Sequence, residues 1–184
     1  MTKKEEFNLS KFLSLILRHK PERIDLKLDE NGWAEVDDLI QKANTKGFKF
    51  DTEKLNTIVE NNNKKRFAFN EDKSKIRANQ GHSISVDLQF QAEKPPKILY
   101  HGTGEKYVQS IEKSGLIKKN RNHVHLSADI KTALIVGKRH GNPKIFIVDA
   151  EKMNQNGFEF YLSKNGVWLI DSVPSEYLSI IEEN

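Results

Sequence analysis

The sequence predicts an α+β protein made of two domains, and three observations support this prediction. The N-terminal half places its apolar residues mainly at helical spacing and ends in a strand–turn–strand pattern. The C-terminal half contains mostly short apolar runs of strand length. Between them, residues 91–97 are polar and include two prolines, which favour an extended connection. We therefore expect one domain over residues 1–92 and a second over residues 97–184.

The first domain opens with an amphipathic helix. Asn8 or Ser10 can cap the start of this helix, and Pro21 is expected to end it. The apolar side chains follow the i, i+3, i+4, i+7, i+8 spacing of one buried helix face, as shown by Leu9, Phe12, Leu13, Ile16 and Leu17.

The rest of the first domain mixes short strands with helices. Residues 33–36 indicate a short strand, and residues 36–43 a short helix. Asp51 or Thr52 can cap another helix. Two short strands around a polar turn at residues 71–74 then predict a hairpin over residues 66–78. This order of elements is typical of a winged-helix domain, which commonly binds nucleic acid, although a fold alone does not establish function.

The second domain is richer in strands and lacks a regular βαβ alternation. A strand at residues 98–100 leads into His101-Gly102-Thr103-Gly104. Further expected strands are 124–126, 144–149 and 177–181, together with a hairpin formed by 158–162 and 167–170 around Asn165-Gly166. The expected helices are 105–113, with Gly115 as its C-terminal cap, and one that runs from a cap at Asp129 to near Gly141.

The composition is that of a soluble globular protein. Hydrophobic residues make up 36% and charged residues 30% of the chain, and no apolar stretch approaches the length of a membrane span. Cysteine is absent, which excludes disulfides, thiolate chemistry and cysteine-bound zinc. No apolar signal segment follows the first residues, and the lack of cysteine fits a reducing cytoplasm. We expect a cytoplasmic protein without a membrane or an obligate protein partner. The net charge of +4 permits a polyanionic partner.

Two basic clusters in the first domain allow two interpretations each. Arg18-His19 stands at the end of the first helix, where cations offset the partial negative charge of the helix terminus. The same pair could instead hold a phosphate, because Arg offers a planar fork of donors and His can carry a proton. Lys64-Lys65-Arg66 precedes a strand and could be a solvated basic surface or an RNA contact.

Two further motifs are rich in hydrogen-bonding groups. Residues 77–83, Arg-Ala-Asn-Gln-Gly-His-Ser, could be an ordinary polar loop or could bind an anion or a ribose. His101-Gly102-Thr103-Gly104 matches neither a Walker phosphate loop nor the dinucleotide fingerprint. This motif could be a turn with a partly buried histidine, or a place where glycine lets a ligand approach while His and Thr bond ribose hydroxyls.

The sequence gives no support for a metal site or for a hydrolytic triad. His123 and His125 lie two residues apart on a strand, but no third ligand has a convincing spacing, so we expect no metal. Gly137-Lys138-Arg139-His140-Gly141 closes a helix, and its charges fit either helix-end stabilisation or a phosphate clamp. No nucleophile elbow and no paired carboxylates are present.

Taken together and in order, these motifs resemble the NAD⁺-dependent RNA 2′-phosphotransferase family along nearly the whole chain. The matching segments are Leu9-Ser10-Lys11-Phe12-Leu13, Leu17-Arg18-His19-Lys20-Pro21, Lys65-Arg66-Phe67, residues 77–83, Leu99-Tyr100-His101-Gly102-Thr103, His123-Val124-His125-Leu126-Ser127 and Gly137-Lys138-Arg139-His140. The resemblance implies a winged-helix RNA-binding lobe followed by an ADP-ribosyltransferase-like NAD-binding lobe.

The resemblance also implies a reaction and a set of site residues. An RNA carrying an internal 2′-phosphate attacks NAD⁺, nicotinamide leaves, and the ADP-ribosylated RNA then yields a 2′-hydroxyl and ADP-ribose 1″,2″-cyclic phosphate. A spliced tRNA junction is the eukaryotic substrate class of the family, and RNA repair is the corresponding general role. The implied catalytic residues are Arg18, His19, Arg66 and Arg139. The implied NAD⁺ pocket is formed by His101, Gly102, Thr103, His125 and Ser127, and the implied RNA contacts are Lys65, Gln80, His82 and Ser83.

Two rival functions remain open at the sequence level. The first is an ADP-ribosyltransferase that acts on terminal phosphates of nucleic acids. ADP-ribosyltransferases that modify proteins usually carry a Glu late in the domain. The comparable strand here reads Gly166-Val167-Trp168-Leu169, without a Glu, which counts against a protein target. The second rival is a non-catalytic RNA-binding winged-helix protein, which would keep the basic hairpin but would not need His101 or Arg139.

Overall fold

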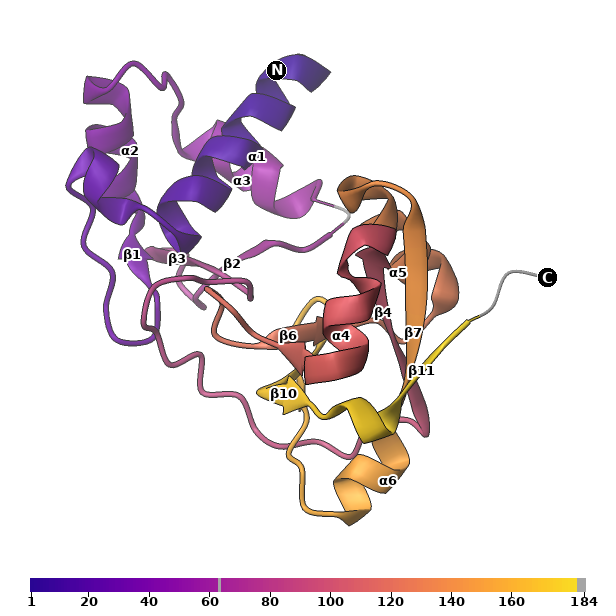
Figure 1. Cartoon of the computed structure of the whole chain (residues 1–184). Helices are drawn as coiled ribbons and strands as arrows, with labels where there is room; N and C mark the ends of the chain where they lie inside the picture. Colours follow the sequence, from indigo (N-terminus) through magenta and orange to yellow (C-terminus); the bar gives the residue numbers. More distant parts are fainter. Residues whose placement is uncertain (63, 182–184) are drawn as a thin grey trace. The chain divides into compact units, whose positions relative to one another are not determined.

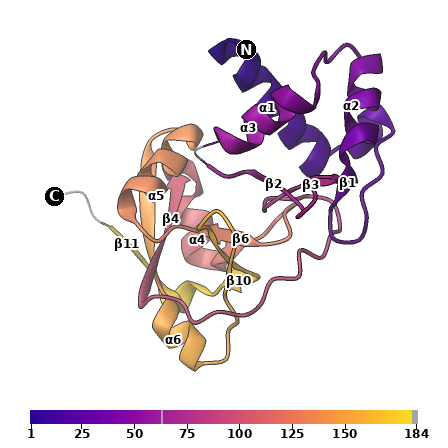
Figure 2. The ribbon, with the colours of Figure 1, turned by 180° about the vertical axis from the view of Figure 1, so that it is seen from behind.

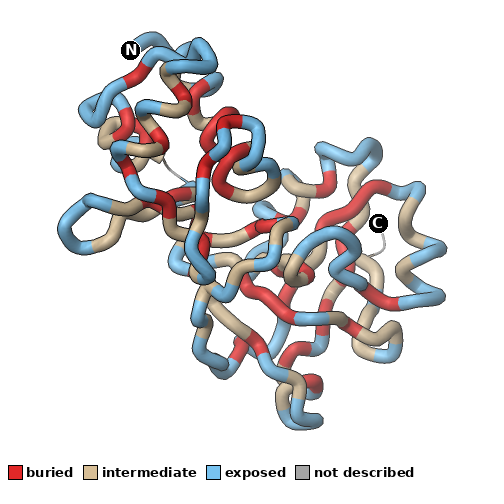
Figure 3. Tube along the Cα trace, turned by 90° about the vertical axis from the view of Figure 1, so that its left-hand side faces the viewer, coloured by how far each residue is buried: buried red, intermediate tan, exposed pale blue. Residues whose placement is uncertain are grey.

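The chain folds into two compact units in the computed structural model, which describes residues 1–62 and 64–181 (Figure 1). The first unit comprises Met1–Gln89 and the second begins at Phe90. Each unit has its own hydrophobic core, because the buried apolar side chains form one cluster within residues 9–78 and another within residues 99–173. The tube in Figure 3 shows these buried stretches in red between exposed loops. The predicted α+β class is confirmed, since helices are combined with small antiparallel sheets.

The first unit begins with α1 (Lys3–Arg18), which starts earlier than the sequence pattern predicted. Thr2, and not Asn8 or Ser10, is the cap. Its side chain accepts a hydrogen bond from the backbone N–H of Glu5, whose carboxylate accepts one in return from the N–H of Thr2. This capping box stabilises one polar turn in front of the apolar stripe. Pro21 ends α1 as expected and opens the short helix η1 (Pro21–Ile24).

Among its described residues, the first unit contains five further elements. They are β1 (Ala34–Glu35), α2 (Val36–Thr45), α3 (Thr52–Glu60), β2 (Phe67–Phe69) and β3 (Lys75–Ala78). The strands form an antiparallel sheet in the order β1-β3-β2, with Ile76 opposite both Ala34 and Phe69. Asp51 caps α3 by accepting from the N–H of Lys54, as predicted. Because α1 packs against β3, the end of α1 and the loop after β3 are held close together.

The second unit is built on a long antiparallel pair, β4 (Ile98–Gly104) and β7 (Pro143–Asp149). β11 (Leu178–Ile180) extends this sheet in the order β11-β7-β4, and α5 (Ile130–Gly137) with η3 (Lys138–His140) packs on it. A second sheet has the order β6-β9-β8, from β6 (Val124–Leu126), β9 (Trp168–Ile170) and β8 (Tyr161–Leu162). The remaining elements are η2 (Glu105–Tyr107), α4 (Val108–Ser114), β5 (Leu116–Ile117), α6 (Ala150–Gln155), β10 (Ser172–Val173) and η4 (Ser175–Tyr177).

Three features of the second unit differ from the sequence prediction. One is the pairing of β5 with β10, which was not predicted. The His101–Gly104 segment is part of β4, whereas we expected it to follow the strand. The short helix α6 was not predicted. Asp149 caps it by accepting from the N–H of Lys152, and it lies at one end of this unit in both ribbon views (Figure 2). Among the described residues, no helix combines the length and the apolar character needed to cross a membrane.

Candidate active site

The C-terminal end of α1 presents the first two predicted catalytic residues. Arg18 is the last residue of the helix and His19 is its C-cap, and both side chains are half-buried. The loop that follows β3 is attached to this end of the helix by two contacts. The backbone N–H of Ser83 donates to the carbonyl of Arg18 at 2.9 Å, and the Ser83 hydroxyl lies 2.9 Å from Nδ1 of His19. Residues 64 positions apart are therefore joined in one local structure.

Arg66 is held beside the same helix end by Asn79. The backbone N–H of Asn79 donates to the carbonyl of Arg66 at 2.8 Å, and its side-chain amide donates to the carbonyl of Lys65 at 2.6 Å. Nη2 of Arg18 also approaches the carbonyl of Arg66, at 3.5 Å. Lys65 has a φ of 40°, a left-handed conformation that an L-residue adopts only when its surroundings hold it there. Asn79, which is 5% exposed, supplies that restraint.

Asn79 is therefore a residue whose importance the sequence analysis missed. It stands inside the polar segment that was singled out, directly after β3, but it was given no role. The available signal was an amide side chain, which can donate and accept, directly after a strand and two residues before a glycine. The structure makes it the connection between the basic segment before β2 and the loop after β3.

His82 lies in the interior of the first unit. It is 1% exposed, and neither ring nitrogen has a hydrogen-bond partner among the described residues. Burial, together with the positive charges of Arg18, His19 and Arg77, lowers the pKa of His82 to about 4. The ring is thus neutral at neutral pH. Of the predicted RNA contacts, Lys65 and Ser83 have exposed side chains and Gln80 is half-buried, whereas His82 supports the loop from within.

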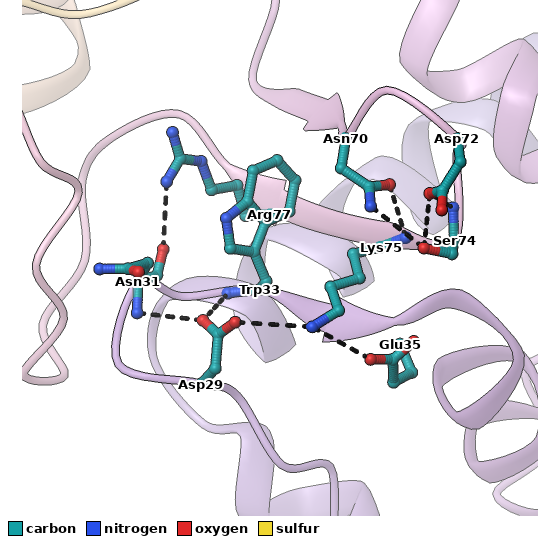
Figure 4. A network of polar contacts seen from close by, with 9 residues as sticks. All are labelled: Asp29, Asn31, Trp33, Glu35, Asn70, Asp72, Ser74, Lys75 and Arg77. Carbon is teal, nitrogen blue, oxygen red and sulfur yellow. Dashed lines mark hydrogen bonds and ion pairs between the residues drawn. The ribbon is translucent and has the colours of Figure 1, made fainter.

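A network on the sheet of the first unit fixes the strand that leads into this loop (Figure 4). The guanidinium of Arg77 on β3 stacks over the ring of Trp33, 4.4 Å from its centroid, and donates to the carbonyl of Asn31 at 3.3 Å. Asp29 accepts from the backbone N–H groups of Asn31 and Trp33 at 3.0 and 2.9 Å. On the same strand, Lys75 lies 3.3 Å from the Glu35 carboxylate. These contacts hold β3 in place, and the loop that starts after Ala78 continues directly from this strand.

In the second unit, three of the predicted cofactor residues lie on β4, one lies on β6 and Ser127 directly follows β6. Nδ1 of His101 donates to the carbonyl of His125 at 3.1 Å. Burial lowers the pKa of His101, so the ring is neutral at neutral pH, with its proton on Nδ1 and an acceptor at Nε2. Tyr100 and Ser127 exchange two backbone hydrogen bonds, at 2.9 and 2.8 Å, which hold Ser127 next to β4.

The glycines of β4 allow a helix to approach the strand closely. A Cβ atom on Gly102 would lie 1.7 Å from the carbonyl oxygen of Ala133 in α5, and one on Gly104 would lie 2.4 Å from that of His140. The sequence left open whether this motif is a turn or a place where a ligand approaches, and the resemblance placed Gly102 in the NAD⁺ pocket. The structure shows that Gly102 makes room for α5. The close packing also places η3, with the exposed side chain of Arg139, against β4.

His123 stands directly before β6 and His125 lies within it. Among the described residues, no group of three or more His, Asp or Glu side chains is suited to hold a metal ion. The ring of His123 instead packs edge-on against Phe90 and Tyr161, with centroid distances of 6.1 and 5.8 Å. The ring therefore belongs to an aromatic cluster of the second unit.

A sequence model of the RNA 2′-phosphotransferase, Tpt1/KptA family matches residues 4–172, which include nearly all described elements of both units. The chain belongs to this family. It is 58% identical over 171 residues to a probable RNA 2′-phosphotransferase of Flavobacterium johnsoniae, a match that covers 93% of this chain and 94% of that protein. A probable RNA 2′-phosphotransferase of Trichormus variabilis is 55% identical over 181 residues, which cover 98% of this chain and 100% of that protein. The resemblance drawn from the motifs is thereby confirmed.

All predicted site residues of this Tpt1/KptA family member lie inside the matched span. The first unit joins Arg18, His19, Lys65, Arg66 and Ser83 through the contacts of Asn79 and of the helix end. The second unit joins His101, Thr103, His125 and Ser127 on β4 and at β6, with Arg139 on the adjoining η3. In each unit, predicted site residues that are distant in the sequence therefore lie close together.

Proposed function

We propose that the chain removes an internal 2′-phosphate from RNA by transferring it to NAD⁺. The reaction passes through an ADP-ribosylated RNA and releases nicotinamide and ADP-ribose 1″,2″-cyclic phosphate. The observation that carries this proposal is the convergence of Arg18, His19 and Arg66 in the first unit of a chain that belongs to the RNA 2′-phosphotransferase family. Arg18 and His19 stand at one helix end, and Arg66 is attached beside them through its backbone carbonyl. Guanidinium and imidazole side chains are suited to the recognition of a doubly charged phosphate.

In the first step, the 2′-phosphate is itself the nucleophile and attacks the ribose carbon that bears nicotinamide. Because the phosphate is already an anion, the step needs positioning more than it needs a base. Arg18 and Arg66 fulfil this role, since the carbonyl groups of both residues are bonded to the loop of residues 79–83 and their backbones are fixed. Because the backbone is already ordered, less conformational entropy is lost when the two side chains bind the phosphate.

In the second step, the ribose hydroxyl next to the new bond attacks phosphorus, and the RNA 2′-oxygen leaves. Negative charge grows on the phosphoryl oxygens, and the arginines, including Arg139, stabilise it. A proton must leave the attacking hydroxyl and reach the departing oxygen. His19 is suited to this transfer, because the contact between its Nδ1 and the Ser83 hydroxyl orients the ring.

The donor set of the second unit fits a nicotinamide dinucleotide as co-substrate. The neutral His101 offers an acceptor at Nε2, which can receive a hydrogen bond from a ribose hydroxyl. Thr103 on β4 and Ser127, which is bridged to Tyr100 of β4, add hydroxyl groups. These residues would bind and orient NAD⁺, which supplies the electrophilic ribose carbon and the nicotinamide leaving group.

The test is incubation of the protein with a 2′-phosphorylated oligonucleotide and NAD⁺. Loss of the 2′-phosphate together with release of nicotinamide supports the proposal. A stable ADP-ribosylated end on a terminally phosphorylated oligonucleotide, with the internal 2′-phosphate left intact, would contradict it. Binding of RNA without any product would also contradict it, and would indicate a non-catalytic RNA-binding protein.

Arg139→Ala should cause ADP-ribosylated RNA to accumulate, or should lower the turnover rate by orders of magnitude. Each loss of about 1.4 kcal/mol of transition-state stabilisation costs about tenfold in rate. Arg23→Ala is a matched control, because Arg23 is an exposed arginine on η1 outside the predicted site. Equal turnover by both variants would remove Arg139 from the catalytic set.

A further inference from the structure

Beside Arg66, the first unit contains a depression that none of the predicted site residues other than Arg66 lines. Its volume is about 260 Å³, and its walls come from α1, the C-terminal end of α3 and the segment just before β2. On α1, Lys3, Phe7 and Ser10 face it at i, i+4 and i+7, the spacing of one helix face. All of its lining residues belong to the first unit, so the depression is a property of that unit alone.

Phe7 is the unusual member of this lining. Its side chain is 67% exposed, whereas Phe12 and Phe67 of the same unit are at most 6% exposed and Phe48 is 42% exposed. An aromatic ring left in water on the wall of a depression offers a flat apolar face to a ligand. Single-stranded nucleic acids are bound through such rings, because every base has a π-face that can stack on them.

The charges around Phe7 favour an anionic ligand. Lys3, Lys64 and Arg66 line the depression, opposed by the single carboxylate of Glu6. Asn62 fixes the far wall, since its side-chain oxygen accepts from Nη1 of Arg66 at 3.3 Å and from the backbone N–H of Lys64 at 3.1 Å. Cations that flank a stacking ring are the combination that binds a base together with its phosphate. The volume of the depression is near the lower end of the range found for ligand pockets, so it suits one nucleotide better than a larger molecule.

We infer that this depression binds the nucleotide next to the 2′-phosphorylated one, with its base stacked on Phe7 and its phosphate near Lys3 and Lys64. The inference rests on the proposed function, because Arg66 is shared between the depression and the residues proposed to hold the 2′-phosphate. An RNA whose 2′-phosphate is bound by Arg66 would lead one neighbouring nucleotide directly over Phe7. The protein would then recognise an unpaired base beside the modified position, whatever the identity of that base.

The experiment places 2-aminopurine on either side of the 2′-phosphorylated nucleotide of a single-stranded oligonucleotide, without NAD⁺. Stacking on Phe7 should quench the fluorescence at one of the two positions. Phe7→Ala should abolish this quenching and weaken binding by about tenfold, the size of one lost base–aromatic stack. Phe7→Trp should keep both properties. Asn8→Ala is the control, because Asn8 is exposed on the same helix and does not line the depression.

A second substrate separates stacking from a general effect on the protein. When an abasic residue replaces the neighbouring nucleotide, wild-type protein and Phe7→Ala should bind the oligonucleotide equally. A tenfold loss with both oligonucleotides would overturn the inference, as would quenching that Phe7→Ala leaves unchanged. If Phe7→Ala alters only the self-association of the protein, Phe7 serves a protein contact and the inference also fails. Because the readout is binding without NAD⁺, it can succeed or fail independently of 2′-phosphate turnover, which tests the proposed function.

Discussion

His82 provides a pH-dependent test of how the loop after β3 is held. The residue is 1% exposed and has a folded-state pKa of about 4, against 6.5 for an exposed histidine. The unfolded chain therefore takes up a proton between pH 7 and pH 4 more readily than the folded chain does. A histidine whose folded pKa is lowered in this way stabilises the fold fully only above pH 6.5. Its contribution is lost as the pH falls from 6.5 toward 4.

The size of the effect follows from the two pKa values. Between pH 7 and pH 5, the preferential protonation of the unfolded chain should lower the free energy of unfolding by about 2 kcal/mol. By pH 4 the loss should reach about 3 kcal/mol. His82→Gln removes the titrating group and keeps a polar side chain of similar size. The variant should therefore lose about 2 kcal/mol less than the wild type over the first interval, whatever its stability at pH 7.

Urea unfolding at several pH values measures this difference. The chain has two tryptophans, one in each unit, so a Trp168→Phe background leaves Trp33 as a reporter of the first unit. Each variant is compared with its parent in that background, which cancels the acid response of the carboxylates and of the remaining histidines. Parallel pH profiles for the two proteins would show that His82 titrates normally and would refute the argument from burial.

Two further predictions concern residues that support the candidate site. Gly102→Ala would force a Cβ atom against the carbonyl of Ala133, so we expect unfolding or insolubility, whereas Gly157→Ala, with no atom within 4 Å of its Cβ, should cost only the roughly 1–2 kcal/mol of a left-handed alanine. A soluble Gly102→Ala protein with wild-type melting behaviour in a thermal scan would contradict this packing argument. Asn79→Ala removes the bond to the carbonyl of Lys65 and should lower the unfolding free energy by about 1–3 kcal/mol in urea titrations. It should also weaken binding of a 2′-phosphorylated oligonucleotide more than Asn44→Ala does, and equal binding by the two variants would show that Asn79 does not position the site.

Local patterns in the sequence were enough to place most elements. The apolar spacing of α1, the cap at Asp51 and the hairpin at Asn165-Gly166 each depend on neighbours within a few residues. The errors came where a short-range signal was weak. Thr2 and Glu5 extend α1 in front of its apolar stripe, and α6 is too short for a periodic pattern to show.

The arrangement of the candidate site could not be predicted from spacing, because it depends on contacts between distant segments. The bond from Asn79 to Lys65 spans 14 residues, and the contact between His19 and Ser83 spans 64. The role of Gly102 illustrates the same limit. A glycine in a strand can admit a ligand or a helix, and only the position of Ala133 shows that a helix lies there. The resemblance to a family supplied the identities of the expected site residues, which these local patterns could not.

The contacts around Arg18 and Arg66 also determine how their roles can be tested. The loop after β3 is attached to both residues through backbone carbonyls, with Ser83 donating to one and Asn79 to the other. Truncation of either arginine side chain keeps these two bonds, because the carbonyl groups remain. Arg66→Ala should therefore leave the loop in place and remove mainly the positive charge and its bond to Asn62. A large loss of 2′-phosphate turnover with little change in unfolding free energy would then report on phosphate recognition, whereas a parallel loss of stability would show that the guanidinium itself supports the fold.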